Sequence, residues 1–86
     1  MNDKVKVKLI VPEIDEVYDI FLPINKKMGT ILKLLNKSVN ELSNEIFPIS
    51  SENKLYNCET LELYDPNKLL FKTDIRNGTK LVLLSS

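Results

Sequence analysis

With 86 residues, the chain has room for one hydrophobic core, so we expect residues 1–86 to form a single domain. The 43% hydrophobic content is typical of a globular protein, and the 12 basic and 12 acidic residues cancel, which argues against nucleic acid as a partner. The sequence has neither an apolar stretch long enough to span a membrane nor a signal-peptide pattern. We therefore expect a cytoplasmic protein that does not insert into membranes.

The residue types needed for chemistry are scarce. The chain has no histidine and no tryptophan, and its one cysteine, Cys58, has no partner for a disulfide or a zinc site. Gly29 and Gly78 are too far apart to form a phosphate-binding loop. Carboxylate pairs such as Glu13 and Asp15 are more simply explained as surface charge. The sequence therefore predicts no catalytic residues, no metal and no cofactor, and a protein that is not an enzyme.

Residues 4–11, KVKVKLIV, alternate with period two, which is typical of a half-buried strand. One face carries Val5, Val7, Leu9 and Val11, and the other carries Lys4, Lys6, Lys8 and Ile10. The lysine row has two interpretations, a stripe that binds an acidic partner or a solvated strand face that discourages edge-to-edge pairing.

A second strand is expected over residues 16–22, joined to the first by a short turn as a hairpin. Tyr18, Ile20 and Leu22 share its inner face, and Val17, Asp19 and Phe21 share a wetter face. The period then changes, and a helix of about four turns is predicted by the apolar stripe of Met28, Ile31, Leu32, Leu35, Val39 and Leu42. Asn25 is the expected N-cap, with Ile24 packed on the first turn. Asn36 is expected to face water.

After the helix, we expect Ile46, Phe47 and Ile49 to cover one end of the core. Residues 54–58 and 61–64 predict two further strands, with a turn at Asp65–Asn67. Residues 68–75 predict a helical turn with Leu70 and Ile75 pointing inward. An Asn-Gly turn then leads into a last strand over residues 80–84. The resulting β-β-α-β-β-β order predicts an α+β roll, with one amphipathic helix across a mixed sheet of four to five strands.

This order of elements resembles a ubiquitin-like β-grasp domain over nearly the whole chain. The stretches that carry the resemblance are IFLPINKKMGTILKLL, which is similar to the second strand and helix start of that family, and LLFKTDIRNGTKLVLL, which is similar to its helical turn, turn and last strand. Among ubiquitin-like proteins the chain is most similar to the YukD/EsaB family, which accompanies the type VII secretion system of Gram-positive bacteria. The resemblance implies a secretion-system membrane component, or its cytoplasmic domain, as the partner.

Ubiquitin and the sulfur carriers of the same fold need a flexible tail ending in Gly-Gly, because glycine passes through the narrow channel of an activating enzyme. Here the predicted last strand is followed by Ser85 and Ser86. We therefore expect a protein that is not conjugated to targets. A covalent modifier or carrier that requires processing is the alternative.

A protein-binding site is expected on the sheet face opposite the helix. If Leu81 and Leu83 face the helix, Val82 and Leu84 face outward, and the first strand adds Lys6, Lys8 and Ile10 to that face. Tyr56 or Cys58 would join them from the third strand. Exposed apolar residues that lie close together suggest a partner. The alternatives are scattered surface aliphatics or a contact between two copies of the chain, that is, a homodimer.

Overall fold

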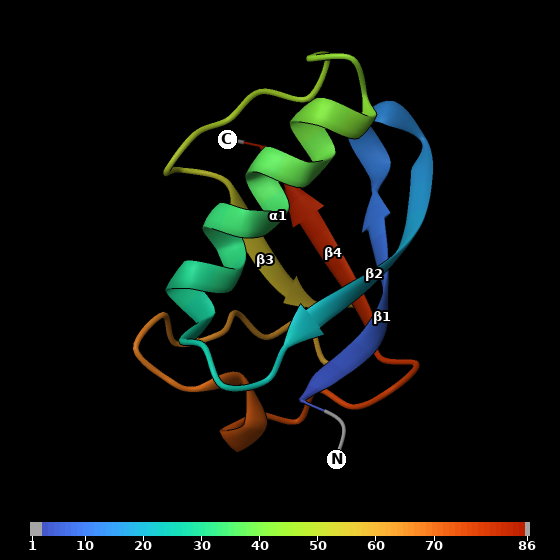
Figure 1. The fold of residues 1–86 in the computed structure, drawn as a ribbon. Helices are drawn as coiled ribbons and strands as arrows, with labels where there is room; N and C mark the ends of the chain where they lie inside the picture. The colour runs from blue at the N-terminus through green and yellow to red at the C-terminus, as the bar shows by residue number, and fades with distance from the viewer. Residues whose placement is uncertain (1–2, 86) are drawn as a thin grey trace.

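The computed structural model describes residues 3–85, and Figure 1 shows that they form a sheet with one α-helix lying across one of its faces. The elements follow in the order β1 (Lys4–Val11), the 3-10 turn η1 (Pro12–Ile14), β2 (Glu16–Pro23), α1 (Met28–Leu42), β3 (Lys54–Asn57), the 3-10 turn η2 (Leu70–Lys72) and β4 (Lys80–Leu84). No helix in this part of the chain is long and apolar enough to cross a bilayer.

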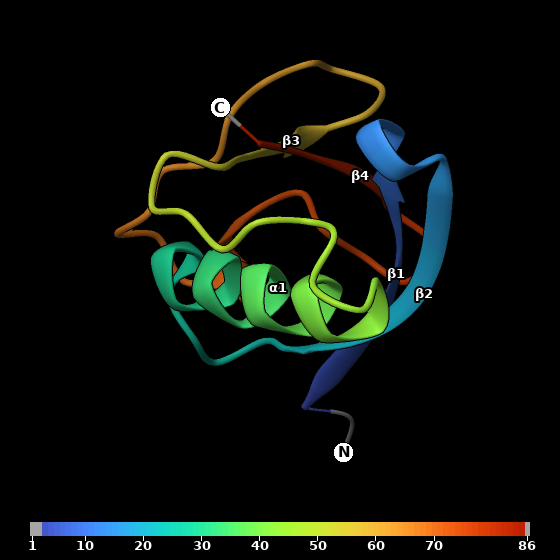
Figure 2. The same cartoon turned by 90° about the horizontal axis from the view of Figure 1, so that it is seen from above.

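The sheet is mixed, as the sequence predicted. Over residues 3–85 it has four strands in the order β2-β1-β4-β3. β1 is antiparallel to β2 and parallel to β4, and β3 is antiparallel to β4. Seen from above, the strands curl around α1 (Figure 2). The expected α+β roll is therefore confirmed, with the first and last strands side by side at its centre.

The core lies between α1 and the inner face of the sheet. Strand alternation turns the apolar residues of the central strands inward, and Val7, Leu9, Leu81 and Leu83 are each 0% exposed. Burying each such side chain is worth roughly 1.5–3 kcal/mol relative to leaving it in water. Other segments complete the core, and the predicted inward positions of Leu70 and Ile75 are confirmed.

The start of α1 differs from the prediction, because no side chain caps it. Lys27, and not Asn25, occupies the N-cap position. The free backbone N–H of Met28 donates to the carbonyl of Lys68 at 2.9 Å, and the N–H of Gly29 donates to that of Pro66 at 2.9 Å. A Cβ atom at Gly29 would lie 3.2 Å from the Pro66 carbonyl oxygen. The distant 66–68 loop therefore caps the helix, and glycine permits its close approach.

The predicted strand over residues 61–64 is absent, and a single bridge between Leu63 and Tyr56 remains. The side chain of Asn57 bends the chain here, since its Oδ1 accepts the N–H groups of Glu59 and Thr60 at 2.8 and 3.2 Å. β3 therefore ends at Asn57, one residue before the predicted end, and the sheet of residues 3–85 has the lower of the two predicted numbers of strands, four.

The predictions for the helix surface and the following loop were partly wrong. Of the three apolar loop residues, Phe47 is fully buried, whereas Ile46 and Ile49 are exposed. Leu42, at the end of the predicted inner stripe, is also exposed because α1 ends there. Asn36 was expected in water but is buried, where its amide donates to the Ser50 carbonyl at 3.1 Å. Hydrogen bonds to the loop satisfy this polar side chain inside the protein.

Candidate functional site

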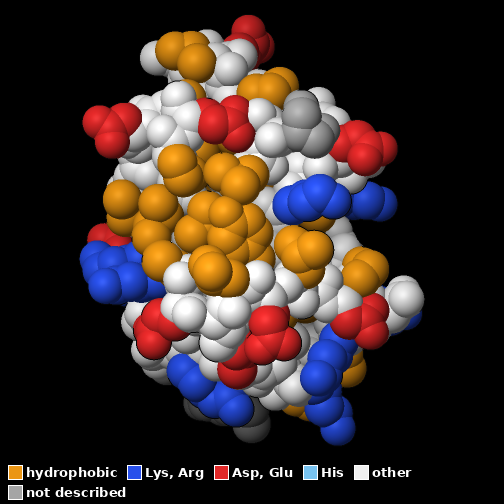
Figure 3. Space-filling model, turned by 180° about the vertical axis from the view of Figure 1, so that it is seen from behind, with side chains coloured by type: hydrophobic (Ala, Val, Ile, Leu, Met, Phe, Trp, Pro, Cys, Tyr) orange, Lys and Arg blue, Asp and Glu red, His pale blue; other side chains and the backbone are white. Residues whose placement is uncertain are grey.

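The sheet face turned away from α1, which we call the open face, collects the outward residues of all four strands. Strand alternation and the observed register place on it Lys4, Lys6, Lys8 and Ile10 from β1, Val17, Asp19 and Phe21 from β2, Lys80, Val82 and Leu84 from β4, and Lys54 and Tyr56 from β3. All five residues predicted for the protein-binding site are therefore on one face. Figure 3 shows this face, with hydrophobic side chains gathered over its middle.

An apolar row crosses the open face from one edge of the sheet to the other. Val17 pairs with Ile10, Ile10 pairs with Val82, and Val82 pairs with Tyr56, so these four residues form a line across β2, β1, β4 and β3. With strands about 4.8 Å apart, the row spans roughly 14 Å. That length matches about nine residues of a helix laid across it. We call Val17, Ile10, Val82 and Tyr56 the apolar row.

The exposure of the row is concentrated at its β2 end. Val82 lies on the open face as predicted, but it is only 7% exposed because Ile10 and Tyr56 flank it from the neighbouring strands. Leu84, beyond the row on β4, is half-buried. Val17 is 60% exposed and is therefore the apolar residue of the row most available to a partner.

One end of the open face is basic. Lys8 pairs with Lys80 across β1 and β4, and Lys6 follows two residues before Lys8. We call Lys6, Lys8 and Lys80 the basic end. Within residues 3–85 the one ion pair joins Lys8 Nζ to Asp19 at 3.2 Å. Both side chains are half exposed, so this pair contributes less than about 1 kcal/mol to stability.

A groove lies at this basic end, with a volume of about 570 Å³. Lys4, Lys6 and Lys8 of β1 line it, together with Phe21 of β2 and the turn at Asn77 and Gly78. The turn is held against β1, because the N–H of Gly78 donates to the Lys6 carbonyl at 2.8 Å and Asn77 Oδ1 accepts the Lys6 N–H at 2.9 Å. The carboxylates of Asp3 and Asp19 line it as well, so the groove combines three amino groups with two carboxylates and one exposed aromatic ring.

Several residues of the open face were missing from the predicted site, among them Val17 and Phe21 on β2 and Lys80 on β4. Val17 was assigned to a wetter strand face because Asp19 follows it, although its pairing with Ile10 extends the apolar row. Leu63 was placed in a strand, whereas it lies in a loop beyond the edge of β3, is 59% exposed and lines a pocket together with residues of α1. The signal for Val17 was available in the hairpin register, while the position of Leu63 depends on a turn that sequence periodicity does not describe.

A hydrogen-bonded cluster holds the loop that carries Leu63. The Tyr64 hydroxyl donates to Asp74 Oδ1 at 2.8 Å, and Asn57 Nδ2 donates to the Tyr64 hydroxyl at 3.1 Å. Burial raises the pKa of Tyr64 to about 12. The hydrogen bond to Asp74 and the negative charge of Asp74 also raise this pKa, whereas the hydrogen bond from Asn57 lowers it. The neutral form of Tyr64 is therefore the form that the fold stabilises.

We expect this cluster to make stability fall at high pH. Tyrosine in the unfolded chain titrates near pH 10, so the contribution of neutral Tyr64 is complete below pH 10 and is lost as the pH rises toward 12. Tyr64→Phe should remove this part of the pH dependence of the denaturation midpoint. It should also remove the tyrosinate absorbance phase centred near pH 12, and a phase that persists unchanged in Tyr64→Phe would contradict the assignment.

The chain after β4 is tied to the β1–β2 turn. The backbone N–H of Ser85 donates to Glu13 Oε1 at 2.6 Å, and the Ser85 hydroxyl donates to the other oxygen of the same carboxylate. Ser86 lies outside the described residues. No group of three or more metal-ligating side chains is present within residues 3–85. The apolar row and the basic end together have the properties of a binding surface.

Comparison with known proteins places the fold. No protein-family model matches the chain, and no curated protein is similar enough to count as a relative. Among solved structures, the chain is similar to ubiquitin from Caldiarchaeum subterraneum, with a TM-score of 0.68 and 13% identity over 96% of this chain and 94% of that one. The fold is therefore that of ubiquitin-like domains, as the sequence predicted.

Two further similar structures belong to secretion machinery. One is the ubiquitin-like domain of the type VII secretion system protein ECCD1 of Mycobacterium tuberculosis, with a TM-score of 0.72 and 14% identity over 99% of this chain and 100% of that one. The other is a chain of the MycP5-free ESX-5 inner membrane complex, with a TM-score of 0.80 and 18% identity over 95% of this chain. Our chain spans 21% of the length of that chain.

Proposed function

We propose that this protein is a non-enzymatic ubiquitin-like interaction module that docks through its open face on a membrane component of a type VII secretion system. The observation that carries the proposal is the apolar row, which crosses all four strands and ends at the exposed Val17. Apolar residues that are contiguous on an otherwise charged surface are typical of a docking site.

The link to secretion rests on two kinds of likeness. The sequence resembles the YukD/EsaB family, and the fold is similar to the ubiquitin-like domain of ECCD1 and to part of a chain of the ESX-5 inner membrane complex. In the first structure a ubiquitin-like domain belongs to a type VII secretion system protein, and in the second a stretch similar to this chain belongs to an inner membrane complex. We infer that this chain supplies an equivalent domain to a related machine, at the cytoplasmic side of the membrane.

We also propose that the chain is not conjugated to targets. A conjugated modifier of this fold has a flexible segment after its last strand, whereas Ser85, the residue that follows β4, donates two hydrogen bonds to Glu13, on the turn between β1 and β2. This contact holds the residue after β4 against the body of the domain. Recovery of other proteins joined covalently to the end of this chain would contradict this part of the proposal.

The test is affinity capture from the native cells with tagged wild type, Val17→Asp and Leu42→Asp. Val17 and Leu42 are 60% and 57% exposed, but Val17 lies on the open face and Leu42 on α1, so the pair is matched except for its location. We expect wild type and Leu42→Asp to recover a membrane component of the secretion system. Val17→Asp should recover at least about tenfold less, which corresponds to about 1.4 kcal/mol of binding free energy.

Thermal melting of each variant shows whether the fold survives. Because both substitutions are at exposed positions, we expect both variants to remain folded. Equal recovery of the membrane component by both Asp variants would place the docking site elsewhere. A second copy of the chain as the only recovered protein would point to a homodimer in its place.

A further inference from the structure

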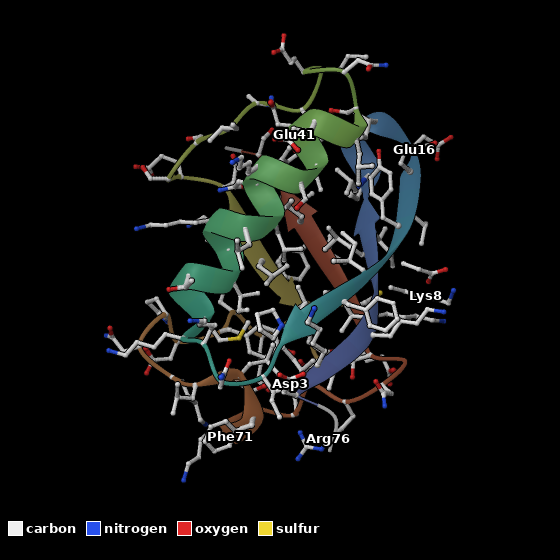
Figure 4. All side chains as sticks on the ribbon, viewed as in Figure 1. Asp3, Lys8, Glu16, Glu41, Phe71 and Arg76 are labelled. Carbon is white, nitrogen blue, oxygen red and sulfur yellow. The ribbon has the colours of Figure 1, made fainter. Side chains whose placement is uncertain are left out.

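The apolar row and the basic end form one continuous surface, and this continuity describes a partner. Ile10 and Lys8 are two residues apart on β1, as are Val82 and Lys80 on β4, so the basic end begins about 7 Å from the row. Lys6 extends it by a further ~7 Å along β1. In Figure 4 the side chain of Lys8 projects from β1 away from α1.

The amino groups of this end have few partners within the protein. Lys8 is paired with Asp19 at 3.2 Å, whereas Lys6 and Lys80 make no ion pair within residues 3–85. Lys6 also lines the groove of about 570 Å³ that opens beside Phe21. Two unpaired ammonium groups next to an apolar row complement a partner that presents carboxylates beside apolar side chains.

We propose that the open face binds a protein segment in which apolar anchors for the row are accompanied by aspartate or glutamate side chains for Lys6 and Lys80. The inference rests on the proposed function and names the chemistry of its partner. The spacing sets the offset between anchors and acids at about 7–14 Å, which is two to four residues of extended chain or about five to nine residues of helix.

A protein segment fits this surface better than a phosphate-rich partner does. Nucleic acid and the headgroups of anionic lipid bind mainly through phosphates, which make no favourable contact with the exposed Val17 and its neighbour Ile10. Asp19 pairs with Lys8 of the basic end, so the amino groups of Lys6 and Lys80 remain, and two such charges suit one or two carboxylates better than a dense row of phosphates. The chain as a whole carries no net charge, so it provides no long-range attraction to a polyanion.

The experiment is zero-length carbodiimide coupling, which joins a lysine amine to a carboxylate only when the two are in contact. The full tagged chain is treated in native cell extract and captured, and the coupled peptides are identified by mass spectrometry. We expect amide links from Lys6 or Lys80 to Asp or Glu residues of a secretion-system component, with apolar residues at the stated offset. Lys33 and Lys37, exposed on α1, are the internal comparison and should remain uncoupled to that component.

Two double variants separate charge from reactivity. Lys6→Arg with Lys80→Arg keeps both charges but removes both amines, so capture should be unchanged while the links at these positions disappear. Lys6→Glu with Lys80→Glu reverses both charges and should reduce capture at least tenfold. If charge reversal leaves capture unchanged while Val17→Asp abolishes it, the proposed function stands and this inference is wrong.

The remaining outcomes also decide the inference. Links from Lys6 or Lys80 to a second copy of this chain would show that the open face binds another copy of the protein, and the inferred acidic partner would be wrong. Binding to vesicles that contain anionic phospholipid, lost on charge reversal, would show that the lysines meet phosphate groups. If wild type captures no protein at all, the proposed function fails and the inference fails with it.

Discussion

Replacing Phe47 by alanine is expected to lower the free energy of unfolding by about 3–5 kcal/mol. Phe47 is 0% exposed although it belongs to the loop after α1. Its N–H donates to Ser43 Oγ at 3.0 Å, and its carbonyl accepts a hydrogen bond from Asn40 Nδ2 at 2.8 Å. A shift of the loop cannot fill the cavity that the missing ring would leave, because the backbone of Phe47 is held by Asn40 of α1 and by Ser43, the C-cap of α1. The measurement is denaturant unfolding of wild type and Phe47→Ala.

Ile46→Ala is the matched control for this loop. Ile46 precedes Phe47 in the chain but is 72% exposed, so its truncation should change the free energy of unfolding by less than about 0.5 kcal/mol. A domain of this size has a total stability of roughly 5–10 kcal/mol, so Phe47→Ala should also be visibly closer to unfolding at 37 °C. Equal effects of the two substitutions would show that Phe47 is not the anchor of the loop.

Replacing Asn36 by alanine is expected to cost about 1–3 kcal/mol, although both residues are small and uncharged. The Asn36 amide donates to the Ser50 carbonyl at 3.1 Å, and its Oδ1 accepts a hydrogen bond from Asn53 Nδ2 at 3.0 Å. Asn53 is itself buried. Its Nδ2 also donates to the Pro48 carbonyl at 2.9 Å, and its backbone N–H donates to the Ser50 carbonyl at 3.2 Å, so each partner of Asn36 keeps one hydrogen bond and the loss should not exceed this range. Chemical denaturation of Asn36→Ala measures the loss.

Asn36→Asp and Lys37→Ala test the cause of this loss. Burial would raise the pKa of a carboxyl at position 36, and the neighbouring Ser50 carbonyl disfavours its charged form. The folded protein therefore tolerates the protonated carboxyl better than the charged one. Asn36→Asp should be less destabilised at pH 4, where more of the carboxyl is protonated, than at pH 7. Lys37→Ala, at an exposed neighbouring position, should be close to neutral. A pH-independent effect of Asn36→Asp would contradict a buried site.

The sequence was sufficient for the elements whose residues alternate or repeat over many positions. The alternation of residues 4–11 and the 3.6-residue period from Met28 both arise because a regular element buries one of its faces. β1 has the predicted bounds, and α1 begins at Met28, where the predicted apolar stripe begins. The predicted outward set of the first strand, including Lys6, Lys8 and Ile10, followed from the same alternation. Local periodicity therefore specified the open face correctly.

The features that the sequence did not predict depend on contacts between distant residues. Asn36 is polar and precedes Lys37, so nothing local distinguishes it from a solvated residue, and its burial depends on contacts with the Ser50 carbonyl and Asn53. The N-terminus of α1 is capped by carbonyls from residues 66 and 68, which no capping motif describes. The low exposure of Val82 likewise follows from its central place in the sheet, which depends on strand order.

We propose above that the open face contacts a membrane component of a type VII secretion system. The most direct test places a photo-reactive amino acid at Val17 in one full-length variant and at Leu42 in another, followed by irradiation of living cells. We predict a covalent adduct with that component from position 17 and none from position 42. An adduct from position 42 alone would contradict the account, since it would place the docking surface on α1.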